Sequence, residues 1–240
     1  MTMKPLDNLL KDQVAYYRAR AAEYDEWVER TGRYDHGPEL NRRWHDDLAE
    51  VGRALDEFAP TGRVLEIAAG TGQWTRRLLR HADQVTVLDA SPEMLAINRA
   101  KVGDPKVRHV LADVFPWQPD ALYDVVLFGF WLSHVPPERF GTFWQLVAAC
   151  LTPEGRVFFV DSLYDERSTA LDHRLEGPDK TTARRRLNDG REFEIVKVFY
   201  APDGQTARLA ELGWDVMVKR TATYFLYGHG ERQREAQTDG

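Results

Sequence analysis

The sequence predicts an α/β fold in which a mostly parallel sheet is covered by helices on both faces. Between residues 63 and 161, short apolar runs rich in β-branched side chains alternate with stretches of helical periodicity. Several of these runs end at an acidic residue or a glycine-rich turn, as parallel strands often do where they enter a loop. The length of 240 residues suits one such domain with additions.

The chain up to residue 60 is expected to form helices that cap the sheet as part of the same domain. A helix rich in aromatic residues is predicted over residues 9–28, and the glycines and proline of residues 31–38 end it. A second helix is predicted because apolar residues then recur every three or four positions and define one amphipathic face. These residues are Leu40, Trp44, Leu48, Val51, Leu55 and Phe58.

The alternating region contains five predicted strands with helices between them. The strands occupy residues 63–68, 85–88, 107–112, 124–130 and 156–161. Helices are expected over residues 73–81, 91–101 and 137–151. Ser91 and Pro92 are typical of a helix start, as the N-cap and the first helical residue.

The sequence after residue 161 departs from this alternation. Residues 162–190 are polar and irregular, and we expect them to be an insertion that covers the site. Strands over residues 192–200 and 214–227 complete a seven-stranded sheet whose last strand is antiparallel. The domain then spans residues 61–230, and residues 231–240 are expected to be a disordered tail.

The composition weighs against a nucleic-acid partner. The net charge is −6, whereas binding to phosphate backbones requires a basic surface. The run Arg184, Arg185 and Arg186 is a local exception with acidic residues close by in sequence. A solvated helix face is the more common explanation of such a run.

The single cysteine, Cys150, rules out an internal disulfide, and no Cys/His spacing around it suits a metal. It lies in an apolar run and is expected to be a buried, unreactive thiol. The first residues lack the apolar core of a signal peptide, and no apolar stretch reaches the ~20 residues that cross a bilayer. The sequence therefore predicts a cytoplasmic protein with no metal and no membrane partner, and it leaves the oligomeric state open.

A glycine-rich turn follows the first predicted strand. This turn contains Gly70 and Gly72, and a helix comes directly after it. Glycines at such positions accept positive φ and allow a ligand to approach the backbone closely. Dinucleotide-binding folds have a third glycine where this chain has Thr75. The glycine pair alone is a weak signal, because an ordinary turn explains it equally well.

Two acidic residues follow the next two strands. Asp89 is placed to accept hydrogen bonds from a ribose diol, and Asp113 is placed to accept one from an adenine amine. Each could instead have a structural role, as a charge or cap at a helix start or strand end. Because the carboxyl ends of parallel strands converge on one crevice, we expect both acids and the glycine turn to face the same pocket.

The chain contains the stretches LEIAAGTGQWT, VTVLDASPEML, LADVFPW and YDVVLFGFWLSHVP, in this order. Together they resemble the class I S-adenosylmethionine-dependent methyltransferases over residues 64–161. The usual pattern of that family is an acidic residue followed by three glycines at alternate positions. Glu66, Gly70 and Gly72 match this pattern, whereas Ala68 replaces the first glycine.

The resemblance implies a Rossmann-like doubly wound fold, S-adenosylmethionine as the cofactor, S-adenosylhomocysteine as the product, and a small-molecule methyl acceptor. It further implies that Asp89 binds both ribose hydroxyls and that Asp113 binds the adenine amine. An N-terminal helix often closes over the cofactor in such proteins, and Tyr17 or Tyr24 would serve this role. The implied cofactor-binding residues are Tyr24, Glu66, Ala68, Gly70, Gly72, Trp74, Asp89, Ala90, Met94, Asp113, Val114, Phe128, Gly129 and Phe130.

His134 is the candidate general base, with Tyr24 as a second catalytic candidate, because His134 follows the fourth strand at the mouth of the crevice. A structural hydrogen bond before a proline turn would explain the same histidine. The candidate substrate residues are Tyr17, Trp131, His134, Tyr164, His173, Arg185 and Lys197. The aromatic residues would form a wall, and His173, Arg185 and Lys197 would hold an anionic group, although residues of these types are more often in the core or on the surface.

The sequence leaves other functions open. O-methylation and N-methylation are both compatible with it. A nicotinamide-dependent oxidoreductase is disfavoured by Thr75 at the third glycine position, and a nucleic-acid methyltransferase is disfavoured by the net charge. A protein that binds S-adenosylmethionine without catalysis would carry the same motifs. Turnover with a panel of acceptors distinguishes it from an enzyme.

Overall fold

The computed structural model of the chain describes residues 4–233. Most of the tail predicted to be disordered, residues 231–240, lies outside the described residues. The first part of that prediction is wrong, because the final strand, β9 (Phe225–Arg232), continues through residues 231 and 232. Backbone pairing explains the extension, since Glu231 lies opposite both Arg156 and Asp215.

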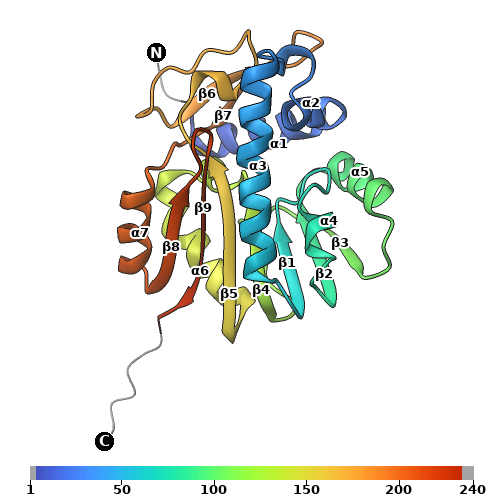
Figure 1. The fold of residues 1–240 in the computed structure, drawn as a ribbon, viewed down its shortest axis with the longest axis vertical. Coiled ribbons are helices and arrows are strands. Elements are labelled where there is room, and N and C mark those ends of the chain that lie inside the picture. The colour runs from blue at the N-terminus through green and yellow to red at the C-terminus, as the bar shows by residue number, and fades with distance from the viewer. Residues whose placement is uncertain (1–3, 234–240) are drawn as a thin grey trace, which may run out of the picture.

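The main sheet has seven strands in the order β3-β2-β1-β4-β5-β9-β8 (Figure 1). Five of them are parallel to one another: β1 (Arg63–Ile67), β2 (Gln84–Asp89), β3 (Val107–Leu111), β4 (Tyr123–Gly129) and β5 (Leu151–Ser162). β9 is antiparallel to both of its neighbours, β5 and β8 (Trp214–Arg220). The predicted seven-stranded, mostly parallel sheet with an antiparallel last strand is confirmed.

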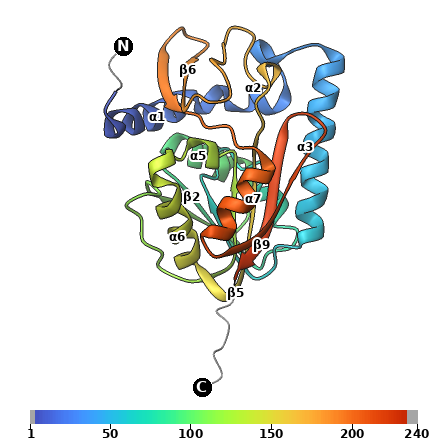
Figure 2. The same ribbon diagram turned by 90° about the vertical axis from the view of Figure 1, so that its left-hand side faces the viewer.

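Helices cover both faces of this sheet, as Figures 1 and 2 show from two sides. One face packs on α3 (Pro38–Phe58), α4 (Thr75–Leu78) and α5 (Pro92–Val102). The other packs on α6 (Phe140–Cys150) and α7 (Pro202–Glu211). The parallel strands are thus buried on both sides, which explains why they are continuous apolar runs in the sequence.

The predicted amphipathic face of α3 is confirmed. Trp44, Val51 and Leu55 on this helix are fully buried in the core that it shares with β1 and β4. Phe58, at the end of the helix, is also buried. The helix therefore contributes to the core of the sheet rather than lying on its surface.

The strands predicted in the last third of the chain are partly wrong. β7 (Glu192–Val196) does not join the main sheet but pairs with β6 (Thr182–Arg186) in a separate two-stranded sheet. The single run predicted over residues 214–227 divides into β8 and β9. β7 stays apart because its apolar side chains pack on the N-terminal helix, where Ile195 and Tyr16 share a small core.

Helix α1 (Leu6–Arg20) lies across the end of the sheet that carries the carboxyl ends of the parallel strands (Figures 1 and 2). One helix is predicted over residues 9–28, but a 3-10 turn, Ala21–Glu23, separates α1 from α2 (Tyr24–Glu29). The ring centroids of Tyr17 and Tyr24 lie 6.4 Å apart across this bend. No helix within residues 4–233 has the length and apolar character needed to cross a membrane.

Candidate functional site

A cavity that is partly open to solvent lies between the carboxyl ends of the parallel strands and helix α1. We call it the cofactor cavity. Leu10, Gln13 and Val14 of α1 form its roof. It brings together most of the residues predicted to bind the cofactor. The predicted residues that line it are Tyr17, Tyr24, Ala68, Gly70, Asp89, Ala90, Met94, Asp113, Val114, Gly129, Phe130, Trp131 and His134.

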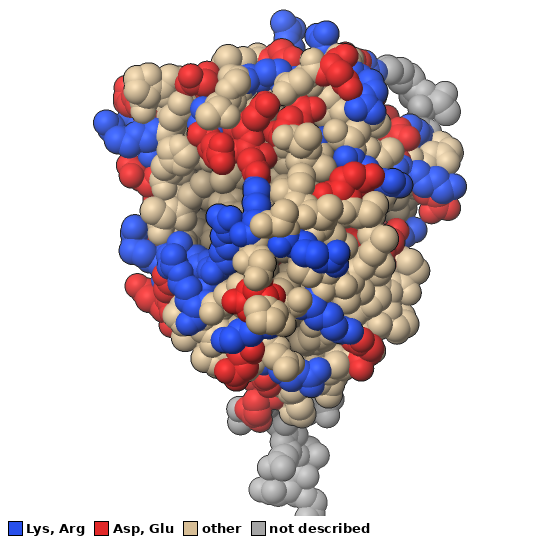
Figure 3. All heavy atoms as spheres, turned by 90° about the vertical axis from the view of Figure 1, so that its right-hand side faces the viewer, with Lys and Arg blue, Asp and Glu red and all other residues tan. Residues whose placement is uncertain are grey.

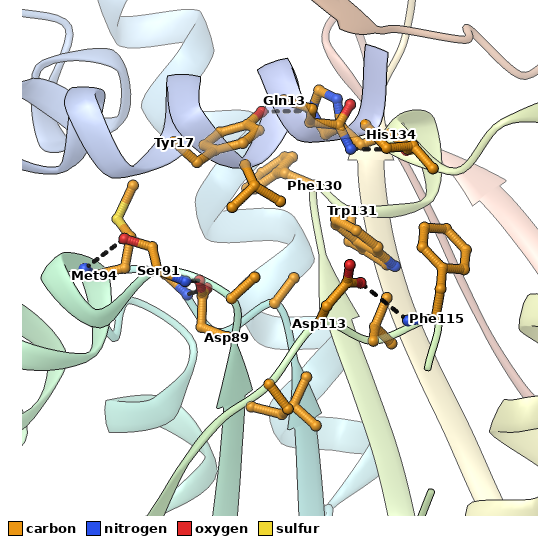
Figure 4. Close-up of a pocket in the computed structure, with 18 of the residues that line it drawn as sticks. Gln13, Tyr17, Asp89, Ser91, Met94, Asp113, Phe115, Phe130, Trp131 and His134 are labelled. Atoms are coloured by element: carbon orange, nitrogen blue, oxygen red, sulfur yellow. Dashed lines mark hydrogen bonds between the residues drawn. The ribbon is translucent and has the colours of Figure 1, made fainter. Parts of the chain in front are cut away.

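Two carboxylates point into the cofactor cavity from the ends of neighbouring strands (Figure 4). Asp89 accepts hydrogen bonds from the N–H groups of Gly70 (2.9 Å) and Ser91 (2.8 Å), and these bonds fix its orientation. Burial raises the pKa of Asp89 to about 6. Asp113 accepts one bond from the Phe115 N–H (3.1 Å). Each carboxylate therefore accepts hydrogen bonds from backbone N–H groups of a loop and also lies on the wall of the cofactor cavity.

The start of α5 beside Asp89 is as predicted. The Ser91 hydroxyl accepts a hydrogen bond from the Met94 N–H (3.1 Å), and Pro92 occupies the first turn. This cap places Met94 against the cavity, where its side chain is 1% exposed. The Ser91 cap thus positions the apolar side chain of Met94 next to the Asp89 carboxylate.

The glycine turn needs left-handed backbone. Gly70 and Gly72 have φ of 54° and 94°, and a Cβ atom on Gly72 would lie 3.2 Å from the Asn98 side chain. Ala68, which replaces the first glycine of the family pattern, also has a positive φ of 53°. An L-residue held in this region carries strain of about 1–2 kcal/mol. Ala68 therefore adopts the left-handed backbone conformation that glycine usually occupies at this position of the turn.

Glu66, which the resemblance assigns to the cofactor, does not line the cofactor cavity. It is 1% exposed and accepts a hydrogen bond from the Thr75 hydroxyl (2.6 Å). Asn98 in turn donates to that hydroxyl (3.1 Å). Burial raises the pKa of Glu66 to about 8. Because side chains alternate along β1, the Glu66 side chain lies beneath the glycine turn. Its hydrogen bond with Thr75 stabilises the start of α4 there.

Three more predicted cofactor residues lie outside the cofactor cavity. Gly72 lines a shallow depression near Lys101, and Trp74 lines a small space behind Gly129. A Cβ atom on Gly129 would lie 2.4 Å from the Trp74 Nε1 atom, so the glycine makes room for the indole. Phe128 is fully buried in the core, because side chains alternate along β4 and its neighbour Gly129 takes the cavity side.

A second cavity, which we call the basic cavity, adjoins the first. The two cavities share four wall residues, namely Tyr17, Tyr24, Phe130 and His134. Three cationic side chains line it: Arg20 from α1, Arg185 from β6, and Lys197 after β7. Two of these three were predicted to hold an anionic substrate.

The cations of the basic cavity are buried with little compensating charge. Arg20 and Arg185 are each 8% exposed and Lys197 is 7% exposed. Asp161 is the single carboxylate within ion-pair distance of any of them among the described residues, with Oδ1 lying 3.7 Å from the Lys197 Nζ. Two positive charges therefore lack a counter-charge. Burial lowers the pKa of Lys197 to about 8 and also lowers the pKa of Arg185.

His134 stands between the two cavities as a neutral imidazole. Its Nδ1 atom lies 2.7 Å from the Val196 carbonyl oxygen, which accepts only, so Nδ1 carries the proton. Nε2 is then free to accept a hydrogen bond from the Tyr17 hydroxyl (2.7 Å), as Figure 4 shows. Burial and the nearby charge of Lys197 hold the pKa of His134 well below its usual value. The side chain can accept a proton only through Nε2.

The remaining substrate candidates lie outside both cavities. The Tyr164 ring packs on Phe199 with centroids 5.2 Å apart, and His173 bonds to the backbone of Arg186. Arg20 and Gln13, by contrast, line the cavities but were not predicted. A signal was available for Arg20, since it follows Tyr17 by three residues and precedes Tyr24 by four, which is the spacing of one helix face.

Comparison with known proteins identifies the family of the chain. A family profile described as "Methyltransferase domain" matches residues 64–155. The structure titled "DhpI-SAH complex structure" is 38% identical with a TM-score of 0.77, covering 96% of this chain and 100% of that chain. The "DhpI-SAM-HEP complex" is 39% identical with the same TM-score of 0.77, covering 94% of this chain and 99% of that one. No curated protein matches the sequence.

A more distant structure shares the fold alone. It is the Burkholderia thailandensis 1,6-didemethyltoxoflavin-N1-methyltransferase with bound 1,6-didemethyltoxoflavin and S-adenosylhomocysteine. It is 18% identical to this chain with a TM-score of 0.63, covering 98% of this chain and 93% of that chain. The fold and the placement of the cofactor cavity define an α/β methyltransferase. The chain belongs to the class I S-adenosylmethionine-dependent methyltransferases, and S-adenosylmethionine is its cofactor.

Proposed function

We propose that the enzyme transfers the methyl group of S-adenosylmethionine to a small, negatively charged acceptor molecule, by O- or N-methylation. The observation that carries this proposal is the pair of adjoining cavities. One has the acidic and apolar lining that suits an adenosine, and the other contains three buried cations. Their shared wall, which includes Tyr17 and Phe130, is where a methyl group would pass between them.

The residues present fit the cofactor. Leu88, Met94 and Val114 offer an apolar surface for adenine, and Asp113 lies beside them to accept a bond from its amine. Asp89 is placed to accept bonds from both ribose hydroxyls. The amino-acid half would lie along Ala68 and Gly70, with Tyr24 on the opposite side of the cavity. These assignments account for the acidic side chains that a purely apolar pocket would not contain.

The charge of the acceptor is inferred from the basic cavity. A buried charge without a partner costs several kcal/mol, by order of magnitude, so a ligand that supplies counter-charge is favoured. Two uncompensated positive charges favour an acceptor with a carboxylate, phosphate or phosphonate group. One relative forms a complex with both SAM and a second ligand, HEP, which supports an acceptor next to the cofactor.

The side chains that line the two cavities have separate roles in the proposed reaction. When bound, S-adenosylmethionine supplies an electrophilic methyl group on a sulfonium. Arg20, Arg185 and Lys197 hold and orient the acceptor. The aromatic rings of the shared wall exclude water and face the cationic centre. Where the acceptor atom carries a proton, the Tyr17 hydroxyl passes it to Nε2 of His134, and an acceptor that reacts as an oxyanion needs no base.

Calorimetric titration with S-adenosylmethionine and S-adenosylhomocysteine tests the cofactor site. Asp89→Ala should weaken both by about ten- to a hundredfold, which corresponds to roughly 1.5–3 kcal/mol for bonds to a charged group. Asp83→Ala is the matched control, since Asp83 is exposed and immediately precedes the same strand. Absence of binding to folded wild type would overturn the proposal. Formation of S-adenosylhomocysteine with a panel of small anions then tests the acceptor, and binding without turnover would instead support a non-catalytic protein.

A nicotinamide cofactor and a nucleic-acid acceptor both have less support. Thr75 takes the third glycine position with its side chain buried against Glu66, which leaves the helix start unlike a pyrophosphate site. Figure 3 shows lysine and arginine next to aspartate and glutamate on the face that carries α4 and α5. Ion pairs also join opposite charges among the described residues, for example Arg108 with Asp120. We therefore retain the prediction of a small-molecule acceptor over nucleic acid, and the predicted cytoplasmic location awaits cell fractionation.

A further inference from the structure

One helix contributes to both cavities. Leu10, Gln13 and Val14 of α1 form the roof of the cofactor cavity, and Tyr17 lies on the wall between the two. Arg20, the last residue of α1, extends its side chain into the basic cavity. Because an α-helix of this length moves as a rigid unit, displacement of the roof also displaces Arg20.

Polar contacts and a small apolar core with the β6–β7 hairpin hold α1 over the cofactor cavity. The Gln13 side chain donates to the His134 carbonyl (3.1 Å) and accepts from the Val196 N–H (3.1 Å). Arg18 forms an exposed ion pair with Glu93 of α5 (3.0 Å). Exposed pairs of this kind contribute about 0–1 kcal/mol. Tyr16 of α1, by contrast, is buried in an apolar core with Ala183 and Ile195 of the hairpin.

In the closed position of α1, Arg20 has favourable aromatic contacts but no counter-charge. Three tyrosine rings surround its guanidinium group, at 4.9–5.6 Å from Cζ. Nη2 donates to the Tyr34 hydroxyl (3.2 Å), whereas the buried Nε has no partner. Among residues 4–233 no carboxylate lies within ion-pair distance of Arg20, and Arg185 and Lys197 share its cavity. An anion in the basic cavity would supply this missing counter-charge to Arg20 only when the helix is closed.

We propose that Arg20 couples the two ligands, so that an anion in the basic cavity closes α1 and tightens the binding of the cofactor. The coupling rests on the proposed function, because it requires both cavities to bind their ligands. A ligand shifts an equilibrium by its preference for one state, and here the anion meets Arg20 in the closed state alone. By linkage, the cofactor must tighten the binding of the anion by the same factor.

Calorimetry with S-adenosylhomocysteine and inorganic phosphate tests the coupling without turnover. The dissociation constant of S-adenosylhomocysteine is measured with and without saturating phosphate, with sodium chloride holding the ionic strength constant. We expect phosphate to lower it by about fivefold or more, and the reverse titration to give the same factor. A ratio of one, with both ligands bound, overturns the coupling and leaves the methyltransferase function standing.

Variants of the same helix show whether Arg20 is the coupling residue. Arg20→Gln should bind phosphate more weakly, through Arg185 and Lys197, and should lose its effect on S-adenosylhomocysteine. Arg20→Lys should restore part of the effect, because it keeps the charge. Lys11→Gln is the matched control, since Lys11 is an exposed cation on the same helix and lines neither cavity, and it should retain the full ratio.

The outcomes separate the two proposals. An unchanged ratio in Arg20→Gln would assign the coupling to another group and overturn the inference. Failure of wild type to bind phosphate would remove both the anion site and the coupling. Failure to bind S-adenosylhomocysteine would overturn the cofactor site itself.

Discussion

At the scale of single residues, Ala68 shows how a site can keep a backbone conformation that its sequence does not favour. Its φ of 53° lies in the left-handed region, next to two glycines that adopt this region without strain. Ala68→Gly should raise the free energy of unfolding by up to about 1 kcal/mol, because relief of strain exceeds the entropy that glycine adds to the unfolded chain. Urea denaturation measures this change.

The neighbouring alanine provides the control for this prediction. Ala69 is also buried but has no positive φ, so Ala69→Gly should lower the free energy of unfolding by about 0.5–1 kcal/mol. Two changes of the same sign would show that the effect of Ala68→Gly does not arise from the backbone.

Lys197 gives the site a dependence on pH. Its pKa of about 8 means that the free enzyme loses one of the three cations of the basic cavity as the pH rises through this value. The KM of an anionic acceptor should therefore rise by several-fold between about pH 7 and 9.5. Lys197→Arg should flatten the profile, because a guanidinium group keeps its charge over this range. An identical rise in the variant would point to a different group.

Single residues also show where inference from sequence stops. Asp89, Ser91 and Asp113 lie where the pattern predicts, because each sits at a strand end or helix start that local sequence defines. Arg185 and Lys197 belong to types that are usually exposed, yet both are buried. Their burial depends on segments distant in the chain, and no local pattern encodes it.

At the scale of elements, one side chain of α1 forms hydrogen bonds in two directions to the segments beneath the helix. Gln13 satisfies the His134 carbonyl and the Val196 N–H, and both of these groups lie in the buried interior. Gln13→Ala should lower the free energy of local opening of α1 by about 1–3 kcal/mol, because it leaves buried polar groups unpaired. Faster amide hydrogen exchange in α1 and faster release of S-adenosylhomocysteine would follow.

An exposed position on the same helix serves as the comparison. Lys11 is exposed on α1, so Lys11→Ala should leave both rates unchanged. If exchange in α1 is equally slow in Gln13→Ala, other contacts hold the helix.

Elements differ in how far the sequence predicts them. The period of apolar residues in α3 predicts both the helix and its buried face, because the pattern is local and long. The β6–β7 hairpin is not predictable in this way. Its apolar side packs on α1, more than 160 positions away in the sequence, so its separation from the main sheet depends on a contact that periodicity does not contain.

At the scale of the whole molecule, the N-terminal helices and the sheet share one core. Trp44 of α3 and Phe225 of β9 have ring centroids 4.7 Å apart, although they come from opposite ends of the chain. We therefore propose that residues 1–60 and 61–230 form one domain. Urea unfolding should give a single transition that coincides for tryptophan fluorescence and circular dichroism.

A truncated chain offers a second test of this unity. Removal of residues 1–60 would expose the sheet surface that Trp44, Val51 and Leu55 cover, so the remainder should not unfold cooperatively. Two separate transitions in the full chain, or a cooperative truncated chain, would contradict a single domain.

The path of β9 has a practical consequence for handling the enzyme. Phe225 pairs with Ser162, which lines the basic cavity, whereas Glu231 pairs with Arg156, at the other end of β5. The strand thus runs away from both cavities toward the opposite edge of the sheet (Figure 1). A dye, a fusion partner or a surface tether can therefore be attached beyond β9. Such an attachment would leave the edge of the sheet that carries both cavities unobstructed. The same attachment before α1 would lie next to the helix that roofs the cofactor cavity.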